Sequence, residues 1–262
     1  MSGQLILHPS TRRQLNAYLI SPAPGLLLLG LPGSGKNSLA RHVGETLLKV
    51  NDLDKYPYAL YIKPEEGKLD IGIDAIRQLN RFVSLKVASD STLNQVAIVR
   101  DAQRMSIEAQ NALLKLLEEP PPGTVLILTA DNAQALLPTV RSRLQTISVA
   151  LPEKADLAAY FDHLDEAEFE RVYALSGGAP GLLTALAGSE EHPLRAAADT
   201  ARLLLTQTSY ERLLMVDQLS KDKTLALNTL TMLQRMATAA LKGGSGATSS
   251  AKWQRVLEAA YT

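Results

Sequence analysis

Residues 25–38 read GLLLLGLPGSGKNS, a short apolar run followed directly by a glycine-rich loop. The loop has the complete GxxxxGK spacing from Gly30 to Lys36, which is typical of a phosphate-binding loop between a buried strand and a helix. The backbone N–H groups of such a loop and the dipole of the following helix attract phosphate, and the lysine contacts the terminal phosphates. We therefore expect an α/β fold with a nucleotide-binding loop. Its predicted residues are Gly30, Gly33, Ser34, Gly35, Lys36, Asn37 and Ser38.

One position of this loop departs from the pattern. Asn37 follows Lys36, where a Ser or Thr hydroxyl would bind magnesium. Ser38 is one residue further on, and a helix would turn it away by about 100°. A glycine-rich turn with a surface lysine is the simpler interpretation, but the strand before the loop and the helix after it favour a nucleotide site. The pattern thus predicts phosphate binding with an altered magnesium contact.

The first part of the chain alternates between two patterns. Apolar runs typical of strands occur at 25–30, 58–62, 96–99, 124–129 and 145–149. Helical spacing occurs between them, from the loop to Leu48, at 71–87 and at 106–119. Continuous apolar strands that alternate with helices predict a parallel sheet covered on both faces. Ser106 is a suitable N-cap for the third helix, and the proline run from Pro120 should end it.

The strand pattern ends at Pro152. Residues 153–187 should form short helices around an SGGAPG turn, and 194–241 longer amphipathic helices. A flexible loop at 243–250 and a last helix from Ala251 should follow. The predicted domains are an α/β domain at 1–151, a small helical lid at 152–188 and a helical C-terminal domain at 189–262.

The composition excludes several classes of protein. The 27 basic and 27 acidic residues balance, so no global field attracts nucleic acid or an anionic membrane. The absence of cysteine excludes disulfides and thiolate metal sites and fits a reducing compartment. The four histidines are scattered, so no metal site is predicted. No apolar run has the length of a membrane span or a signal-peptide core, and we expect a cytoplasmic protein without membrane contact.

Several motifs beyond the loop resemble one known family. They are HPSTRRQLNAYL (8–19), IGIDAIRQLNRFVSL (71–85), NALLKLLEEPP (111–121) and TVLILTADNAQALLPTVRSRL (124–144). In this order and at these separations they resemble the AAA+ subunits of the bacterial DNA polymerase III clamp loader. The resemblance implies an AAA+ P-loop domain, a small helical lid and an all-helical collar-like domain. Residues 189–262 are short for a full collar, so we expect a shortened collar or a truncated chain.

The resemblance also aligns the end of the strand VAIV (96–99) with the Walker B motif. Counting back from Asn111 places Arg100 where the hydrolysing subunits carry the magnesium-binding Asp, and Asp101 where they carry the catalytic Glu. A guanidinium at this position repels the cation. The lid turn at 178–182 lacks the arginine that the hydrolysing subunits direct at the γ-phosphate. Such departures are typical of the non-hydrolysing delta-prime subunits of this family.

A basic motif, RSR at 141–143, resembles the Ser-Arg-Cys motif of the family, with Leu144 in place of Cys. In the family this arginine reaches into the nucleotide site of the adjacent subunit and stabilises charge on the transferred phosphate. The resemblance therefore implies that Arg143 acts catalytically in trans, as an arginine finger. Without the resemblance, the motif would be an ordinary basic cluster before a strand.

The function implied by the resemblance is that of a delta-prime-like subunit of the DNA polymerase III holoenzyme, which helps to load the sliding clamp onto primed DNA. Its partners would be the ATPase subunits and delta in a hetero-oligomeric ring. It would require no cofactor, bind ATP or ADP weakly at most, and bind no zinc. Two alternatives stay open. One is a clamp-loader-like subunit with a weak ATPase of its own, and the other is an AAA+ module of a DNA repair or recombination machine.

Overall fold

The computed structural model describes residues 5–64, 68, 70–85, 93–188, 193–242 and 253–254, without the side chains of Gln218 and Lys242. The loop expected at 243–250 and the helix start expected at Ala251 lie outside these residues. The chain divides into two compact units, Met1–Pro152 and Glu153–Thr262. The further division of the second part into lid and C-terminal domain stays a prediction.

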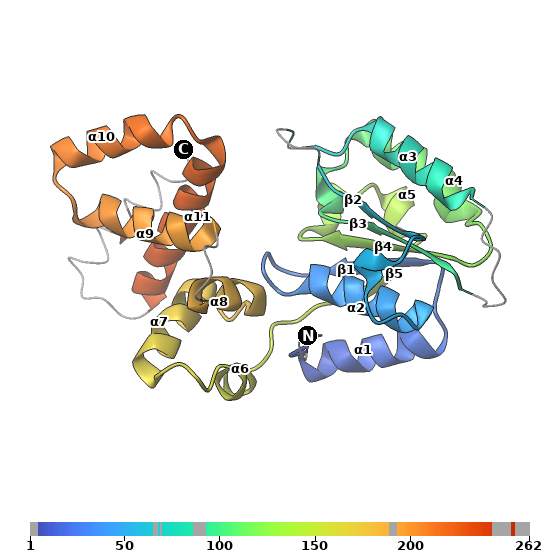
Figure 1. The fold of residues 1–262 in the computed structure, drawn as a ribbon, viewed down its shortest axis with the longest axis horizontal. Helices are drawn as coiled ribbons and strands as arrows, with labels where there is room; N and C mark the ends of the chain where they lie inside the picture. The colour runs from blue at the N-terminus through green and yellow to red at the C-terminus, as the bar shows by residue number, and fades with distance from the viewer. Residues whose placement is uncertain are drawn as a thin grey trace. The chain divides into compact units, whose positions relative to one another are not determined.

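The first unit contains a five-stranded sheet. Its strands are β1 (Gly25–Leu29), β2 (Ala59–Ile62), β3 (Gln95–Val99), β4 (Thr124–Ala130) and β5 (Gln145–Ser148). They follow the order β2-β3-β4-β1-β5, and every pairing is parallel (Figure 1). The predicted parallel sheet is confirmed. Since the strands all run in one direction, their carboxyl ends meet at one edge, where open α/β sheets bind ligands.

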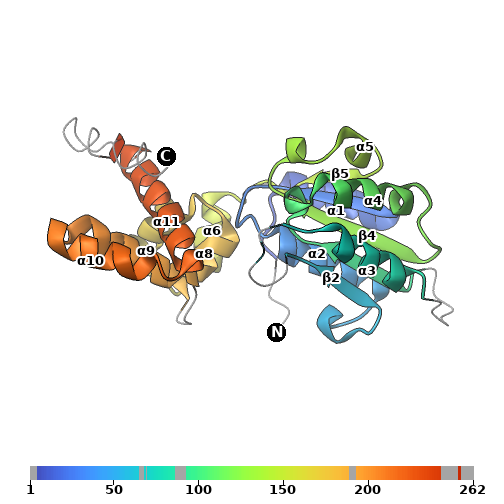
Figure 2. The ribbon, with the colours of Figure 1, turned by 90° about the horizontal axis from the view of Figure 1, so that it is seen from above.

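Helices cover both faces of this sheet, as predicted. The helices are α1 (Pro9–Ile20), α2 (Lys36–Leu48), α3 (Ile73–Val83), α4 (Ile107–Glu118) and the short α5 (Pro138–Arg141). Short 3₁₀ turns occur at η1 (Leu53–Lys55), η2 (Ala102–Arg104) and η3 (Ala133–Ala135). Helices α1 and α2 pack on one face, and α3 and α4 pack on the other (Figure 1; Figure 2).

Successive side chains of each strand point to opposite faces of the sheet, and this produces two hydrophobic cores. On β1, Leu27 faces α3 and α4, whereas Leu26 and Leu28 face α1 and α2. All three are almost completely buried. This explains why the strands read as continuous apolar runs: a parallel sheet covered on both faces buries every side chain of its central strands.

The helix ends follow local chemistry. The Ser106 side chain accepts a hydrogen bond from the Ala109 N–H at 3.2 Å, which confirms the predicted N-cap of α4. Helix α4 ends at Glu118, ahead of the prolines. Helix α3 ends at Val83, earlier than expected. After the last i→i−4 bond, from the Ser84 N–H to the Asn80 carbonyl, the Leu85 N–H donates to the Phe82 carbonyl at 3.1 Å, a tighter i→i−3 turn that follows the helix end.

The described residues of the second unit form helices and no strands, as the sequence predicts. The helices are α6 (Lys154–Tyr160), α7 (Glu166–Ser176), α8 (Pro180–Ala187), α9 (Pro193–Thr206), α10 (Ser209–Leu219) and α11 (Lys223–Lys242). Helix α9 packs against α11 through small and flexible side chains, including Ala197, Ala201 and Met232. In the described part of the chain, no helix has the length and apolar character needed to cross a bilayer.

Candidate nucleotide-binding site

The glycine-rich loop lies where β1 ends and α2 begins, at the carboxyl edge of the sheet. The Gly30 N–H donates to the Ala130 carbonyl at 3.1 Å, which ties the start of the loop to β4. Gly33 and Gly35 have φ angles of 78° and 86°, in the left-handed region that favours glycine. Ser34 is buried within the loop, and Ser38 is exposed on α2. The loop thus joins β1 to α2 through two left-handed glycines. Nucleotide binding by its residues stays a prediction.

Lys36 is the first residue of α2 and only 4% exposed. Its ammonium forms an ion pair with the carboxylate of Asp131 and donates to the Leu31 carbonyl at 3.3 Å. Asp131 directly follows β4, the strand beside β1, and sequence reasoning missed it. An acidic residue after a strand neighbouring the loop strand was the available signal, although the strand order could not be known from the pattern.

The side chain of Asn37 points toward the sheet. Its Oδ1 accepts a hydrogen bond from the Thr129 hydroxyl at 2.8 Å, and Thr129 is completely buried in β4. The same hydroxyl oxygen accepts from the Asp101 N–H at 3.1 Å. Thr129 therefore links the loop to the end of β3. The amide oxygen of Asn37 is occupied by a protein donor, at the position where the loop pattern requires a magnesium ligand.

Arg100 and Asp101 follow β3 at the same edge of the sheet. The Arg100 guanidinium lies 4.8 Å from the ring centroid of Tyr61. Tyr61 belongs to β2, and β2 lies on the other side of β3 from the loop strand. The Arg100 N–H donates to the Ile62 carbonyl at 2.8 Å, and Asp101 has a left-handed φ of 53°. Asp101 is therefore linked to the loop through Thr129, while the Arg100 side chain packs against the neighbouring strand.

Arg143 lies at the opposite end of the strands, where their amino ends meet. It precedes β5, and a Cβ on Gly25, the first residue of β1, would lie 3.2 Å from the Arg143 carbonyl. The loop begins at the other end of β1, so the five-residue strand separates the two by about 13 Å or more at 3.3 Å per residue. The structure does not bring Arg143 to the phosphate loop of its own chain.

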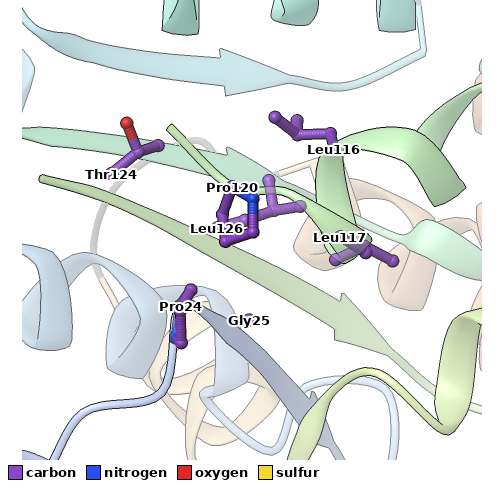
Figure 3. A pocket seen from close by; sticks show the side chains of 7 residues that line it. All are labelled: Pro24, Gly25, Leu116, Leu117, Pro120, Thr124 and Leu126. Atoms are coloured by element: carbon purple, nitrogen blue, oxygen red, sulfur yellow. The ribbon is translucent and has the colours of Figure 1, made fainter. Parts of the chain in front are cut away.

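The Arg143 side chain is held at that edge mainly by Glu118 and Thr139, with a longer contact of 3.4 Å to the Ser142 hydroxyl. One Nη donates to the Glu118 carboxylate at 2.7 Å and the other to the Thr139 carbonyl at 2.9 Å. About a third of the side chain is exposed. A small apolar pocket lies at the same edge, at the amino ends of β1 and β4 (Figure 3). It is lined by Pro24, Gly25, Leu116, Leu117, Pro120, Thr124 and Leu126, and none of these can act as an acid or base.

The turn between α7 and α8 belongs to the second unit. Gly177 and Gly178 have φ angles of 62° and 76°, and α8 begins at Pro180. The nearest arginine before this turn, Arg171, lies on α7, 3.7 Å from the Glu168 carboxylate. Across the described ranges, no group of three or more histidine or acidic side chains could hold a metal ion.

Comparisons with known proteins agree with this architecture. The family model described as "DNA polymerase III, delta subunit" matches residues 22–153, half of the 262-residue chain. "DNA polymerase III subunit delta'" of Pseudomonas aeruginosa is 32% identical over 178 residues, 60% of this chain and 54% of that protein. The Escherichia coli protein of the same name is 29% identical over 182 residues, 62% of this chain and 53% of that one.

A further relative carries a different name. The "Replication factor C small subunit" of Staphylothermus marinus is 27% identical over 164 residues, 59% of this chain and 48% of that protein. The chain spans about half the length of the curated relatives it matches.

Solved structures share the fold. A DNA polymerase III gamma subunit-related protein from Thermotoga maritima has a TM-score of 0.54 at 21% identity, covering 94% of this chain and 92% of that one. A RuvB variant from the same organism has a TM-score of 0.50 at 14% identity, covering 93% and 78%. These similarities show the AAA+ fold: a P-loop domain with a parallel sheet, followed by helices. The family itself is shown by the model that matches residues 22–153, which include the loop and the RSR motif. The chain belongs to the DNA polymerase III delta-subunit family of clamp-loader proteins, close to the delta-prime subunits.

Proposed function

We propose that this chain is a non-hydrolysing subunit of a DNA polymerase III clamp loader, with the role of delta-prime in DNA replication. It would assemble with the ATPase subunits and delta into a ring and help to load the sliding clamp onto primed DNA in the cytoplasm. Arg143 would complete the nucleotide site of a neighbouring ATPase subunit. The relatives named delta-prime support the role, and the placement of Arg143 supports its action on another chain.

The observation that carries the proposal is the separation of Arg143 from its own loop. A residue at the amino end of β1 cannot contact phosphate bound at the carboxyl end of the same strand. It is, however, partly exposed at the edge of the unit, where a second chain could reach it. An arginine supplied in trans is worth about 10³–10⁵ in rate for GTPases, which makes such a placement functionally important.

The absence of hydrolysis in this chain follows from the magnesium contacts. Phosphoryl transfer by P-loop proteins requires a magnesium ion held by a loop hydroxyl and a Walker B carboxylate. Here Asn37 has no hydroxyl and its amide oxygen is bonded to Thr129. Arg100 takes the place that the family resemblance gives to the carboxylate. We therefore propose that the chain requires no cofactor, binds ATP or ADP weakly and without magnesium, and binds no zinc.

The retained loop supports one alternative, a subunit with a weak ATPase of its own. Lys36 and the left-handed glycines keep the cradle for phosphate. This alternative predicts magnesium-dependent turnover by the purified chain that Lys36→Ala abolishes. An AAA+ module of a repair or recombination machine is the other alternative, and it predicts that the chain does not assemble with clamp-loader subunits.

Assembly tests the proposal. The purified chain would be mixed with the ATPase subunits and delta of the same organism and run on a gel-filtration column. The expected result is one complex that contains this chain and loads clamps onto primed DNA. A complex of the other subunits that excludes this chain would contradict the proposal.

A further inference from the structure

The Lys36 ammonium of the phosphate loop is paired with the carboxylate of Asp131. The pattern of the loop assigns the Lys36 ammonium to the terminal phosphates of a nucleotide, yet this ammonium forms an ion pair with Asp131. The Lys36 side chain is 5% exposed, so water contributes little to satisfying its charge. A buried cation of this kind needs an anionic partner, and here the chain itself supplies that partner.

Asp131 is held in this position by a second residue. Gln103 lies in η2, after β3, and its Nε2 donates to Asp131 Oδ2 at 3.2 Å. In return, the Asp131 N–H donates to Gln103 Oε1 at 3.3 Å. One carboxylate oxygen therefore faces Lys36 and the other faces Gln103. These two attachments, to Lys36 and to Gln103, fix the carboxylate beside the loop.

We propose that Asp131 is a built-in competitor for phosphate at Lys36, so that a nucleotide binds only when this carboxylate leaves the ammonium. A carboxylate and a phosphate group cannot both lie against Lys36 without strong repulsion between their charges. The apparent affinity for a ligand falls in proportion to the fraction of molecules in the competent state. The ion pair of Asp131 with Lys36, which we call the closed state, thus weakens the binding of any polyphosphate, whether a nucleoside diphosphate, a nucleoside triphosphate or free pyrophosphate.

This closure is separate from the loss of magnesium contacts. Asn37 is bonded to Thr129 and makes no use of Asp131 or Gln103. Removing the Asp131 charge should therefore restore phosphate binding without restoring magnesium dependence. The inference rests on the proposed nucleotide site, but not on the role of the chain in a clamp loader.

The test is equilibrium binding of a fluorescent ADP analogue to the full chain in EDTA. Asp131→Asn should bind at least about tenfold more tightly than the parent chain, because the closed fraction is removed. Asp74→Asn is the matched control, since Asp74 is an exposed carboxylate on α3 paired with Arg77, and it should bind as the parent does. The double variant Asp131→Asn/Lys36→Ala should lose the gain. Equal affinities of Asp131→Asn and the parent would overturn the proposal.

Competition with pyrophosphate identifies the bound group. Displacement of the analogue from Asp131→Asn by pyrophosphate is expected if the gain lies in phosphate contacts. If pyrophosphate does not displace the analogue, the increased affinity does not come from phosphate contacts, and the proposal is overturned.

A second variant protects the test against misfolding, because Asp131→Asn leaves a buried charge without its partner. Gln103→Leu keeps both charges and removes only the attachment of Asp131. It should bind the analogue about threefold more tightly than the parent, and unchanged affinity would overturn the proposal where Asp131→Asn does not fold. Complex assembly is measured separately. A chain that assembles but gains no affinity refutes only the closure, and one that gains affinity but does not assemble refutes only the clamp-loader role.

Discussion

The Arg143 guanidinium donates to the Glu118 carboxylate at 2.7 Å, joining the segment after α5 to the last residue of α4. The pair holds the arginine at the amino edge of the sheet, away from the phosphate loop of its own chain. The Arg143 side chain is 35% exposed and the Glu118 side chain 51%, so water and salt compete with the pair. A neighbouring nucleotide could therefore replace Glu118 as the anionic partner without a rearrangement of the core.

Glu118→Gln should change the free energy of unfolding by less than about 1 kcal/mol, because exposed ion pairs contribute little. Urea denaturation of the full chain measures this. Leu113→Ala is the contrasting variant: Leu113 is completely buried in the core under α4, and its truncation should cost about 2–5 kcal/mol. Equal losses for the two variants would contradict the view that the Arg143–Glu118 pair is dispensable for folding.

Thr129→Val should lower the free energy of unfolding by about 1–3 kcal/mol, since it leaves the Asp101 N–H and the Asn37 Oδ1 without their partner. Valine has nearly the same shape, so packing is preserved. Thr46→Val is the matched control, because Thr46 is exposed and bonds only to a carbonyl of its own helix. It should change stability by less than about 0.5 kcal/mol. The linking role of Thr129 is refuted if both variants unfold at the same urea concentration.

The purified chain should release no phosphate from ATP above the protein-free rate, with or without magnesium. Asn37→Thr restores the loop hydroxyl but leaves Arg100 at the Walker B position, so it should also remain inactive. A colorimetric phosphate assay over several hours measures both. Magnesium-dependent release that disappears in Lys36→Ala would instead favour an ATPase in its own right.

The stability of the chain should fall with acid partly through Asp52. A hydrogen bond from Lys55 lowers the pKa of Asp52, and the Asp54 N–H and the charge of Arg41 act in the same direction. The folded state thus favours the ionised carboxylate. Its contribution to stability is present above the unfolded pKa of about 3.9 and is lost as the pH falls through the lower folded pKa.

Asp52→Asn removes this contribution. The melting temperature of the variant should therefore fall less steeply than that of the parent as the pH drops below about 4. Thermal unfolding followed by circular dichroism across this pH range makes the comparison. Parallel curves for the two proteins would show that Asp52 does not contribute to the acid dependence.

Local signals in the sequence predicted most of the first unit. Apolar runs of strand length gave the positions of β1 to β5 to within two residues at either end, and Ser106 gave the start of α4. Helix α1 was not predicted as an element, although Pro9 at its first position and the His8 side chain that caps it are start signals. Its amphipathic pattern is weak, because only Thr11, Leu15 and Tyr18 of its 12 residues are buried.

The candidate site could be predicted only in part. The loop is one continuous segment, so its spacing identifies it. The partner of Lys36 is 95 residues away at Asp131, and the partner of Asn37 is 92 residues away at Thr129. Such contacts depend on β4 lying beside β1, and strand order is a property of the folded sheet. For the same reason, the distance between Arg143 and its own loop became visible only in the structure.

The most direct test of the account is single-turnover ATP hydrolysis at the neighbouring site of the assembled loader with primed DNA. Arg143→Ala should slow this step at least about tenfold while the complex stays intact on gel filtration. Arg143→Lys should restore only part of the rate, because lysine lacks the planar fork of donors. Arg141→Ala, the control in the same motif, should leave the rate unchanged. An intact complex in which Arg143→Ala hydrolyses ATP at the parental rate would contradict the central claim that this chain donates its arginine to another subunit.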